Sequence, residues 1–111
     1  MTIAPEFKQQ LDEIIAQHPV LLFMKGNKNF PMCGFSANTV ECLKLAGFEN
    51  FATVNVLENE DVRSGMKEYS DWPTFPQLYI KGEFIGGADI VKDMFDEGEL
   101  QEIAQEMKDA E

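Results

Sequence analysis

The chain has 111 residues and a formal net charge of −11 at pH 7, and 44% of its residues are hydrophobic. These values are typical of one globular domain, which we expect to span residues 1–111. The negative charge argues against binding to nucleic acid and to anionic membrane surfaces, which attract cations. No apolar run approaches the ~20 residues of a membrane span, and no basic segment followed by an apolar one opens the chain, so we expect a cytoplasmic protein.

The first half of the chain predicts a helix, a strand, a second helix and a second strand. An apolar stripe on residues 5–17 indicates an amphipathic helix, and the five apolar residues 20–24 have the length of a buried strand. After a polar loop, an apolar pattern that ends at Gly47 predicts a helix beginning near Cys33. Residues 51–56 predict the next strand, and the strand–helix–strand order implies that the two strands are parallel.

The second half predicts a helix, a hairpin and two further helices. Residues 59–69 are amphipathic, and the segment after them carries two prolines that cannot lie inside a helix. Two short apolar runs, 77–80 and 83–85, flank a two-residue turn and predict a β-hairpin. Asp89 is a favourable N-cap for the next helix, and Gly98 separates it from the last one. This order predicts an α/β, thioredoxin-like fold with a four-stranded mixed sheet flanked by helices.

One thiol, Cys33, stands on the turn between the first strand and the following helix. Pro31 and Gly34 mark a turn there, so a reactive thiol is favoured over a buried, inert one. Free backbone N–H groups and the positive end of the helix dipole stabilise a thiolate at such a position, and Lys25 and Lys28 across the loop act in the same direction. We therefore predict a lowered pKa for the thiol of Cys33.

The remaining residues exclude several kinds of thiol chemistry. Ser36 stands where a Cys-x-x-Cys pair has its second thiol, and Cys42 lies roughly 13 Å along the helix from Cys33 and on the opposite face, so no intrachain disulfide is expected. We expect Cys42 to pack as a small buried hydrophobe. A zinc site needs about four N or S ligands, and one chain has only two cysteines and His18. The thiol, a nearby lysine and the N–H groups at two helix starts suit a small anionic thiol ligand.

Four motifs, in this order, carry a resemblance to a known family. They are Met24-Lys25-Gly26, Pro31-Met32-Cys33-Gly34-Phe35-Ser36, Trp72-Pro73-Thr74-Phe75-Pro76-Gln77 and Gly86-Gly87-Ala88-Asp89. From about Ile14 to Leu100, the chain resembles the monothiol glutaredoxins. The resemblance implies a thioredoxin fold with an extra N-terminal helix, a cis peptide bond before Pro76 and glutathione as the bound cofactor.

Carried over position by position, the resemblance implies a complete glutathione site. Lys25 and Arg63 would hold the glycine carboxylate of glutathione, and Phe75 would offer its backbone to the cysteinyl part. Ala88 and Asp89 would bind the γ-glutamyl end, with the Asp89 carboxylate facing the amino group. Some relatives have a cysteine at the position of Ala88 that pairs with the active-site thiol, and this chain lacks that route.

The resemblance also implies a 2Fe–2S cluster shared by two chains. Such a cluster needs four thiolates, which Cys33 from each subunit of a homodimer and two glutathiones would supply. Members of the family pass clusters to apo iron–sulfur proteins and pair with BolA-type proteins, so we expect a cluster carrier in iron–sulfur delivery and iron homeostasis. The alternatives are a weakly active glutathione-dependent oxidoreductase that deglutathionylates proteins through Cys33, and a regulatory binding module. Trp72 is either a partner contact or a residue that packs its own loop, and packing is favoured.

Overall fold

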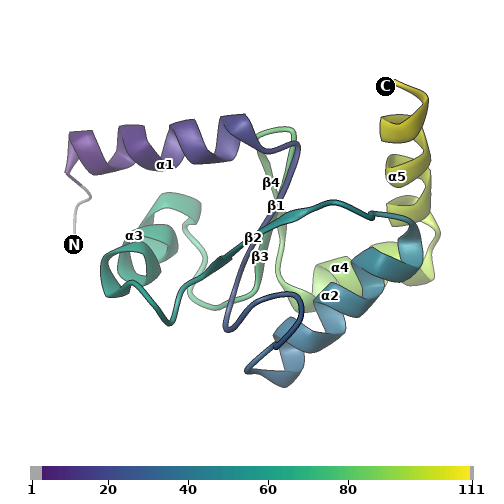
Figure 1. Cartoon of the computed structure of the whole chain (residues 1–111), viewed down its shortest axis with the longest axis horizontal. Helices are drawn as coiled ribbons and strands as arrows, with labels where there is room; N and C mark the ends of the chain where they lie inside the picture. Colours follow the sequence, from purple (N-terminus) through teal and green to yellow (C-terminus); the bar gives the residue numbers. More distant parts are fainter. Residues whose placement is uncertain (1–3, 111) are drawn as a thin grey trace.

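The computed structural model describes residues 4–110, and its helices and strands follow the predicted order. The helices are α1 (Pro5–Gln17), α2 (Gly34–Ala46), α3 (Glu60–Ser70), α4 (Ala88–Asp96) and α5 (Glu99–Asp109), and the strands are β1 (Val20–Met24), β2 (Ala52–Asn55), β3 (Gln77–Ile80) and β4 (Glu83–Gly86) (Figure 1). The predicted thioredoxin-like arrangement, with a helix before the first strand, is confirmed.

The four strands form one mixed sheet in the order β2-β1-β3-β4. β1 runs parallel to β2 and antiparallel to β3, which in turn is antiparallel to β4. The two central strands are buried along their whole length, because helices cover both faces of the sheet. The edge strands β2 and β4 are more exposed.

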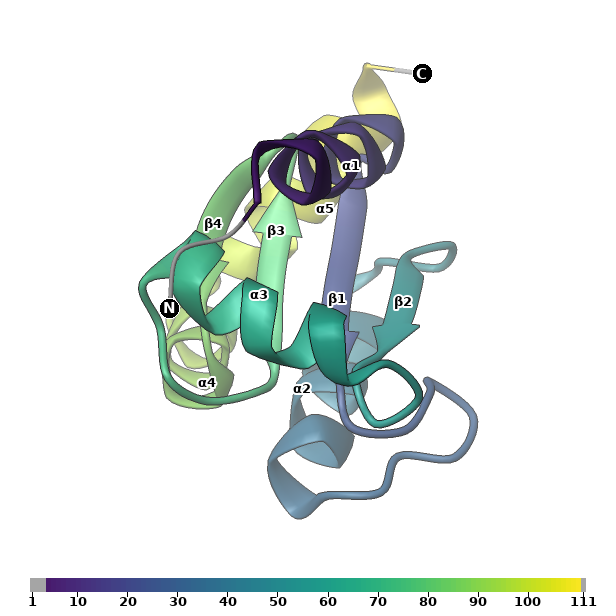
Figure 2. The same ribbon diagram turned by 90° about the vertical axis from the view of Figure 1, so that its left-hand side faces the viewer.

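Helices α1 and α3 lie on one face of the sheet, and α2, α4 and α5 lie on the other (Figures 1 and 2). Alternate side chains of β1 point to opposite faces, as the pleat of a strand requires. Leu21 and Phe23 therefore pack toward α1 and α3, whereas Leu22 and Met24 pack toward the other three helices. Each face of the sheet has its own apolar core, and the functional residues lie where the strands end.

The N-terminal helix α1 is fastened directly to α3. A side chain at Gly65 in α3 would place its Cβ 2.6 Å from Cε2 of Phe7, so the two helices approach closely at this glycine. The hydroxyl of Tyr69 donates a hydrogen bond to the carboxylate of Asp12, which also pairs with Lys8. These contacts join α1 to α3 and so help to hold α3 in position.

The start of helix α4 differs from the sequence-based prediction. Gly87, and not Asp89, is the N-cap of α4, so the predicted capping role of Asp89 is wrong. Asp89 lies in the first turn instead, where a carboxylate is still favoured by the positive end of the helix dipole. Cys33 is the N-cap of α2, one residue before the helix begins. Within residues 4–110, no helix has the length and apolar character needed to cross a membrane.

Candidate functional site

A cavity of about 640 Å³ opens beside Cys33, where the loop after β1, helix α3, the segment before β3 and the start of α4 meet. Its lining residues are Lys25, Cys33, Phe35, Arg63, Lys67, Trp72, Pro73, Thr74, Phe75, Gly87, Ala88, Asp89 and Ile90. The structure thus brings Cys33 and the five residues that the resemblance assigns to glutathione to one cavity, although they come from positions spread over most of the chain. Lys67 and Trp72 join them.

The thiol of Cys33 is half-buried at the start of α2. The backbone N–H of Ser36 has the largest effect on its pKa, which it lowers, and the N–H of Phe35 and the positive charge of Lys25 lower it further. Partial burial acts in the opposite direction, but the pKa still lies below that of an ordinary free thiol. The predicted lowering of the pKa of Cys33 is therefore confirmed, and the N–H groups at the N-terminus of α2 are its main source.

Ser36 contributes more than the absence of a second thiol. Its side chain is fully buried, and its hydroxyl oxygen Oγ accepts a hydrogen bond from the backbone N–H of Lys25 at 3.2 Å. This contact joins the end of β1 to the first turn of α2. The sequence interpretation treated Ser36 only as a missing cysteine and did not foresee this role.

The loop between β1 and Cys33 is closed by backbone contacts that require a glycine. Gly26 has a φ of +89°, and a Cβ at this position would lie 2.4 Å from the carbonyl oxygen of Phe30. The N–H of Met32 donates to the carbonyl oxygen of Lys25 at 2.9 Å, and Gly26 pairs with Pro31 in an isolated bridge. The loop therefore returns to its starting point and sets Cys33 close to Lys25.

The two lysines of this region have different surroundings. The ammonium group of Lys28 donates to the carbonyl oxygen of Phe51 at 3.0 Å and lies 5.2 Å from the centre of its ring. Lys25 lines the cavity and lowers the pKa of Cys33. Of the two lysines expected to act on Cys33, the structure supports Lys25 alone, because Lys28 is engaged with Phe51.

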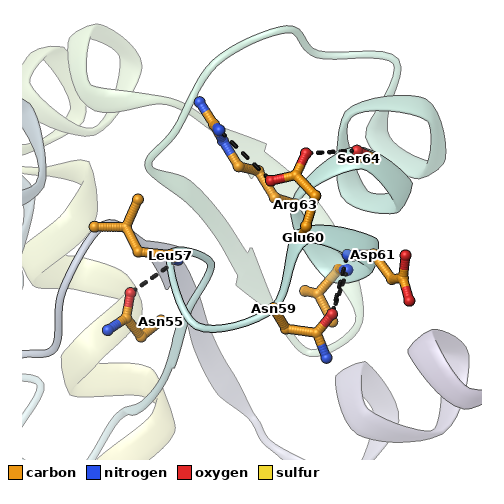
Figure 3. A network of polar contacts seen from close by, with 8 residues as sticks. Asn55, Leu57, Asn59, Glu60, Asp61, Arg63 and Ser64 are labelled. Atoms are coloured by element: carbon orange, nitrogen blue, oxygen red, sulfur yellow. Dashed lines mark hydrogen bonds and ion pairs between the residues drawn. The ribbon is translucent and has the colours of Figure 1, made fainter.

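Helix α3 supplies two further cations to the cavity, Arg63 and Lys67. Asn59 caps this helix by accepting hydrogen bonds from the N–H groups of Asp61 and Val62 at 3.0 and 3.2 Å (Figure 3). Lys67 was not named from the sequence, although it follows Arg63 by one helical turn and must therefore share a face with it.

Arg63 is only partly neutralised by a neighbouring carboxylate. Its Nη1 lies 3.7 Å from Oε2 of Glu60, and the other carboxylate oxygen of Glu60, Oε1, accepts a hydrogen bond from the hydroxyl of Ser64 (Figure 3). An exposed ion pair of this length contributes little to stability, about 0–1 kcal/mol. The Nε atom of Arg63 is buried and has no hydrogen-bond partner among residues 4–110. The guanidinium group therefore keeps capacity to bind an anion.

Another wall of the cavity is formed by the segment that precedes β3. The peptide bond between Phe75 and Pro76 is cis, as the resemblance implied. The buried side chain of Gln77 donates to the carbonyl oxygens of Trp72 and Thr74 at 3.1 and 3.2 Å. Gln77, a residue of β3, therefore holds this segment in place, and Phe75 lines the cavity.

Trp72 holds its own loop in place by packing against Phe84 and the start of α4, as expected. Its ring lies 6.0 Å from that of Phe84, and a Cβ at Gly87 would come within 3.0 Å of its indole nitrogen. The glycine at position 87 therefore lets the start of α4 approach the indole. Trp72 also lines the cavity, so its packing role and its place at the site are compatible.

Exposed apolar side chains surround the thiol on its outer side. Phe30, Met32 and Phe35 are 76%, 70% and 62% exposed, although side chains of this type are usually buried. All three belong to the loop before Cys33 or to the first turn after it. An apolar surface beside a reactive group is typical of a site that another molecule covers.

The second cysteine, Cys42, differs from Cys33 in its surroundings and in the direction of its pKa shift. It lies within α2, half-buried against the core on that side of the sheet, whereas a fully buried side chain was expected. Burial raises the pKa of its thiol, and the carboxylate of Asp96 adds to this effect. Both cysteines are free, and only Cys33 opens to the cavity.

The fold and the site together define a thioredoxin-like protein with one activated thiol beside a cation-lined cavity. A family model described as Glutaredoxin matches residues 20–85. Monothiol glutaredoxin-S7, chloroplastic, of rice is 55% identical over 100 residues, which cover 90% of this chain and 59% of the relative. Glutaredoxin 4 of Escherichia coli K12 is 47% identical over 98 residues, covering 88% of this chain and 84% of that protein. The solution structure of reduced poplar apo GrxS14 is similar with a TM-score of 0.78 and 53% identity over 96% of each chain.

The chain therefore belongs to the glutaredoxin family, in its monothiol branch. It spans 59% and 57% of the length of two chloroplastic relatives that it matches, from rice and Arabidopsis thaliana. Relatives with comparable identity come from bacteria and, by name, from chloroplasts and mitochondria. The cytoplasmic location thus stays a prediction.

Proposed function

We propose that this chain binds glutathione in the cavity beside Cys33 and that two chains together carry a 2Fe–2S cluster to apo iron–sulfur proteins. The observation that carries the proposal is the grouping of three cations, Lys25, Arg63 and Lys67, around one activated thiol in a chain whose net charge is −11. Such a cavity attracts a small anion against the charge of the surrounding surface. Glutathione is an anionic thiol and fits this requirement.

The glutathione molecule would be held at both ends and in the middle. Lys25 and Arg63 would bind its glycine carboxylate by charge-assisted hydrogen bonds. The backbone of Phe75 would pair with the cysteinyl part. At the start of α4, the free N–H groups near Ala88 would bind the γ-glutamyl carboxylate, and the carboxylate of Asp89 would bind the amino group.

In this proposal the 2Fe–2S cluster is cargo that the protein passes on, and the thiol of Cys33 fits the ligand set that the cluster needs. A 2Fe–2S cluster of this type is held by four thiolates. Each chain offers one accessible thiol with a lowered pKa, Cys33, because the pKa of Cys42 is raised and its side chain packs against the core. Two chains and two glutathiones complete the set. The exposed Phe30, Met32 and Phe35 around Cys33 would be covered when the second chain binds.

Binding by a small, exchangeable ligand suits a carrier better than a permanent holder. Glutathione can leave without unfolding the protein, so half of the cluster ligands are replaceable by those of an acceptor. The partners in this proposal are a second copy of the chain, a BolA-type protein and the apo iron–sulfur proteins that receive the cluster.

A second candidate function rests on the lowered pKa of Cys33 and on the lack of a resolving thiol near it. The Cys33 thiolate would attack the glutathione sulfur of a glutathionylated protein, form a mixed disulfide with glutathione and release the protein thiolate. A second glutathione thiolate would then attack the mixed disulfide, giving glutathione disulfide and free Cys33. This deglutathionylation needs only one cysteine.

Anaerobic reconstitution of the purified chain with iron, sulfide and glutathione separates the two candidates. We expect a charge-transfer spectrum in the visible range, a dimer by size-exclusion chromatography and loss of both when glutathione is removed. A colourless monomer under these conditions would contradict the carrier function. The deglutathionylation assay would then decide the second candidate.

A further inference from the structure

Asn55, the last residue of β2, connects the two walls of the cavity that carry its cations. Its side-chain oxygen Oδ1 accepts a hydrogen bond from the N–H of Gly26 at 3.0 Å and another from the N–H of Leu57, also at 3.0 Å. Figure 3 shows the contact with Leu57. Gly26 directly follows Lys25, and Leu57 lies in the connection from β2 to α3, the helix that carries Arg63.

The side chain of Asn55 acts at the point where β1 and β2 separate. Met24 pairs with Asn55 in the parallel ladder, and the N–H of Val56 donates to the carbonyl oxygen of Met24 at 2.9 Å. Beyond this level, one chain segment turns toward Cys33 and the other toward α3. The amide oxygen of Asn55 bonds to both segments after they part.

The charged groups of the two walls are only weakly held by their own contacts. Among the residues that the structure describes, the ammonium group of Lys25 makes no ion pair, and Arg63 has only the pair with Glu60 at 3.7 Å. The separation of the two cations therefore depends on the backbone segments that carry them. Asn55 joins these segments through one atom.

We propose that Asn55 is a positioning residue, which keeps Lys25 and Arg63 at the separation that lets both bind one carboxylate of the ligand. The inference rests on the proposed function, in which this group is the glycine carboxylate of glutathione. Loss of the Asn55 oxygen should weaken the recognition of that carboxylate and leave the remainder of the ligand site intact.

Asn27 offers a matched control within the same loop. Its Oδ1 also accepts two backbone hydrogen bonds, from the N–H groups of Asn29 and Phe30, both at 2.9 Å. Both partners lie in the loop itself, so Asn27 makes no bond to the connection before α3. Substitution of Asn27 therefore removes the same number of contacts of the same kind, without separating the two walls.

The test compares the reaction of Cys33 with two disulfides, glutathione disulfide and the disulfide of glutathione glycine ethyl ester. In both reactions the Cys33 thiolate attacks one sulfur, forms a mixed disulfide and releases one thiolate, so only the charge at the glycine end differs. Equilibrium constants for the wild type, Asn55→Leu and Asn27→Leu are measured by mass spectrometry of the intact protein. The ratio of the two constants reports recognition of the carboxylate alone.

We expect the wild type and Asn27→Leu to favour the free carboxylate by about tenfold, the effect of a charge-assisted hydrogen bond. In Asn55→Leu the ratio should fall to roughly two, while the constant for the ester stays within about twofold of the wild type. A general structural effect would lower both constants equally and would overturn the inference, as would an unchanged ratio. If circular dichroism shows that Asn55→Leu does not fold, Asn55→Ser is tested instead, because the shorter side chain of serine moves the oxygen away from the two N–H groups.

The same data separate the failure of this inference from the failure of the proposed function. If the wild type does not discriminate between the two disulfides, Lys25 and Arg63 do not bind the glycine carboxylate, and the proposed placement of glutathione is wrong. If the wild type discriminates and Asn55→Leu discriminates equally well, only the positioning role of Asn55 is wrong.

Discussion

The hydroxyl oxygen of Ser36 accepts a hydrogen bond from the backbone N–H of Lys25 at 3.2 Å. Ser36 lies in the first turn of α2, and Lys25 directly follows β1, so the contact holds the cation beside the helix N-terminus that activates Cys33. A cysteine at position 36 would be a poor replacement, because sulfur is a weak acceptor. Ser36, which stands in place of a second thiol, therefore holds the backbone of Lys25 more firmly than a cysteine would.

Substitution Ser36→Ala should lower the free energy of unfolding by about 1 kcal/mol, because the partly buried N–H group of Lys25 loses its partner. The measurement is chemical denaturation at equilibrium. Ser64→Ala is the matched control, since the hydroxyl of Ser64 bonds only to the exposed Glu60, and we expect a change within about 0.5 kcal/mol. Equal losses in the two variants would show that the Ser36 contact is not an anchor.

The two cysteines should respond in opposite ways to replacement by serine. Cys33→Ser should abolish cluster binding and glutathione exchange, because it removes the only thiol that opens to the cavity. Cys42→Ser should leave both intact, since its side chain lies against the core. Visible absorbance after reconstitution and an exchange assay measure the two activities. A colourless Cys42→Ser protein that still folds would show that the assigned ligand is wrong.

The two lysines of the loop should differ in their effect on the ligand. Lys25→Ala should weaken the binding of glutathione about tenfold, because a charge-assisted hydrogen bond is lost. Lys28→Ala should change it less than about twofold and should instead lower stability by about 0.5–1.5 kcal/mol through the loss of its contacts with Phe51. Titration calorimetry and denaturation provide the two numbers. Similar effects on binding would mean that both lysines act only as general charge.

The pH dependence of alkylation should distinguish the two thiols within one sample. The pKa of Cys33 is lowered by backbone N–H groups and Lys25, whereas burial raises the pKa of Cys42. Iodoacetamide should therefore modify Cys33 with a midpoint at lower pH than Cys42, as measured by peptide mass spectrometry. Identical midpoints for the two thiols would contradict the lowered pKa of Cys33. The same shift affects stability: the thiolate of Cys33 stabilises the fold above the pKa of an unfolded thiol, and this contribution is lost as the pH falls through the lowered pKa of the folded state.

Much of the fold follows from the sequence, because each element has a pattern that is local. The apolar run 20–24 and the hairpin turn at Lys81-Gly82 predict strands that the structure contains at nearly the same bounds. The placement of Cys33 at the start of α2 follows from the turn residues around it. The resemblance then added residues from distant parts of the chain, such as Arg63 and Asp89, to the same site.

The features that sequence reasoning missed depend on contacts between distant segments. Lys28 was expected to act on the Cys33 thiol as Lys25 does, because its bond to Phe51 has no local sign in the sequence, and Ser36 likewise gives no local sign of its bond to Lys25. Asp89 has the chemistry of an N-cap, but the chain enters α4 through Gly87, where a Cβ would lie only 3.0 Å from the indole nitrogen of Trp72. Tertiary packing decided each case over local preference.

In the proposed function, glutathione and Cys33 together form the ligand set of a 2Fe–2S cluster shared by two chains. This ligand set is tested most directly by counting the components of the reconstituted complex after gel filtration: protein, iron, sulfide and glutathione. We expect two chains and two glutathiones for each 2Fe–2S cluster, and the same composition by native mass spectrometry. A cluster that forms at full occupancy without glutathione, or that requires Cys42 in its place, would contradict it.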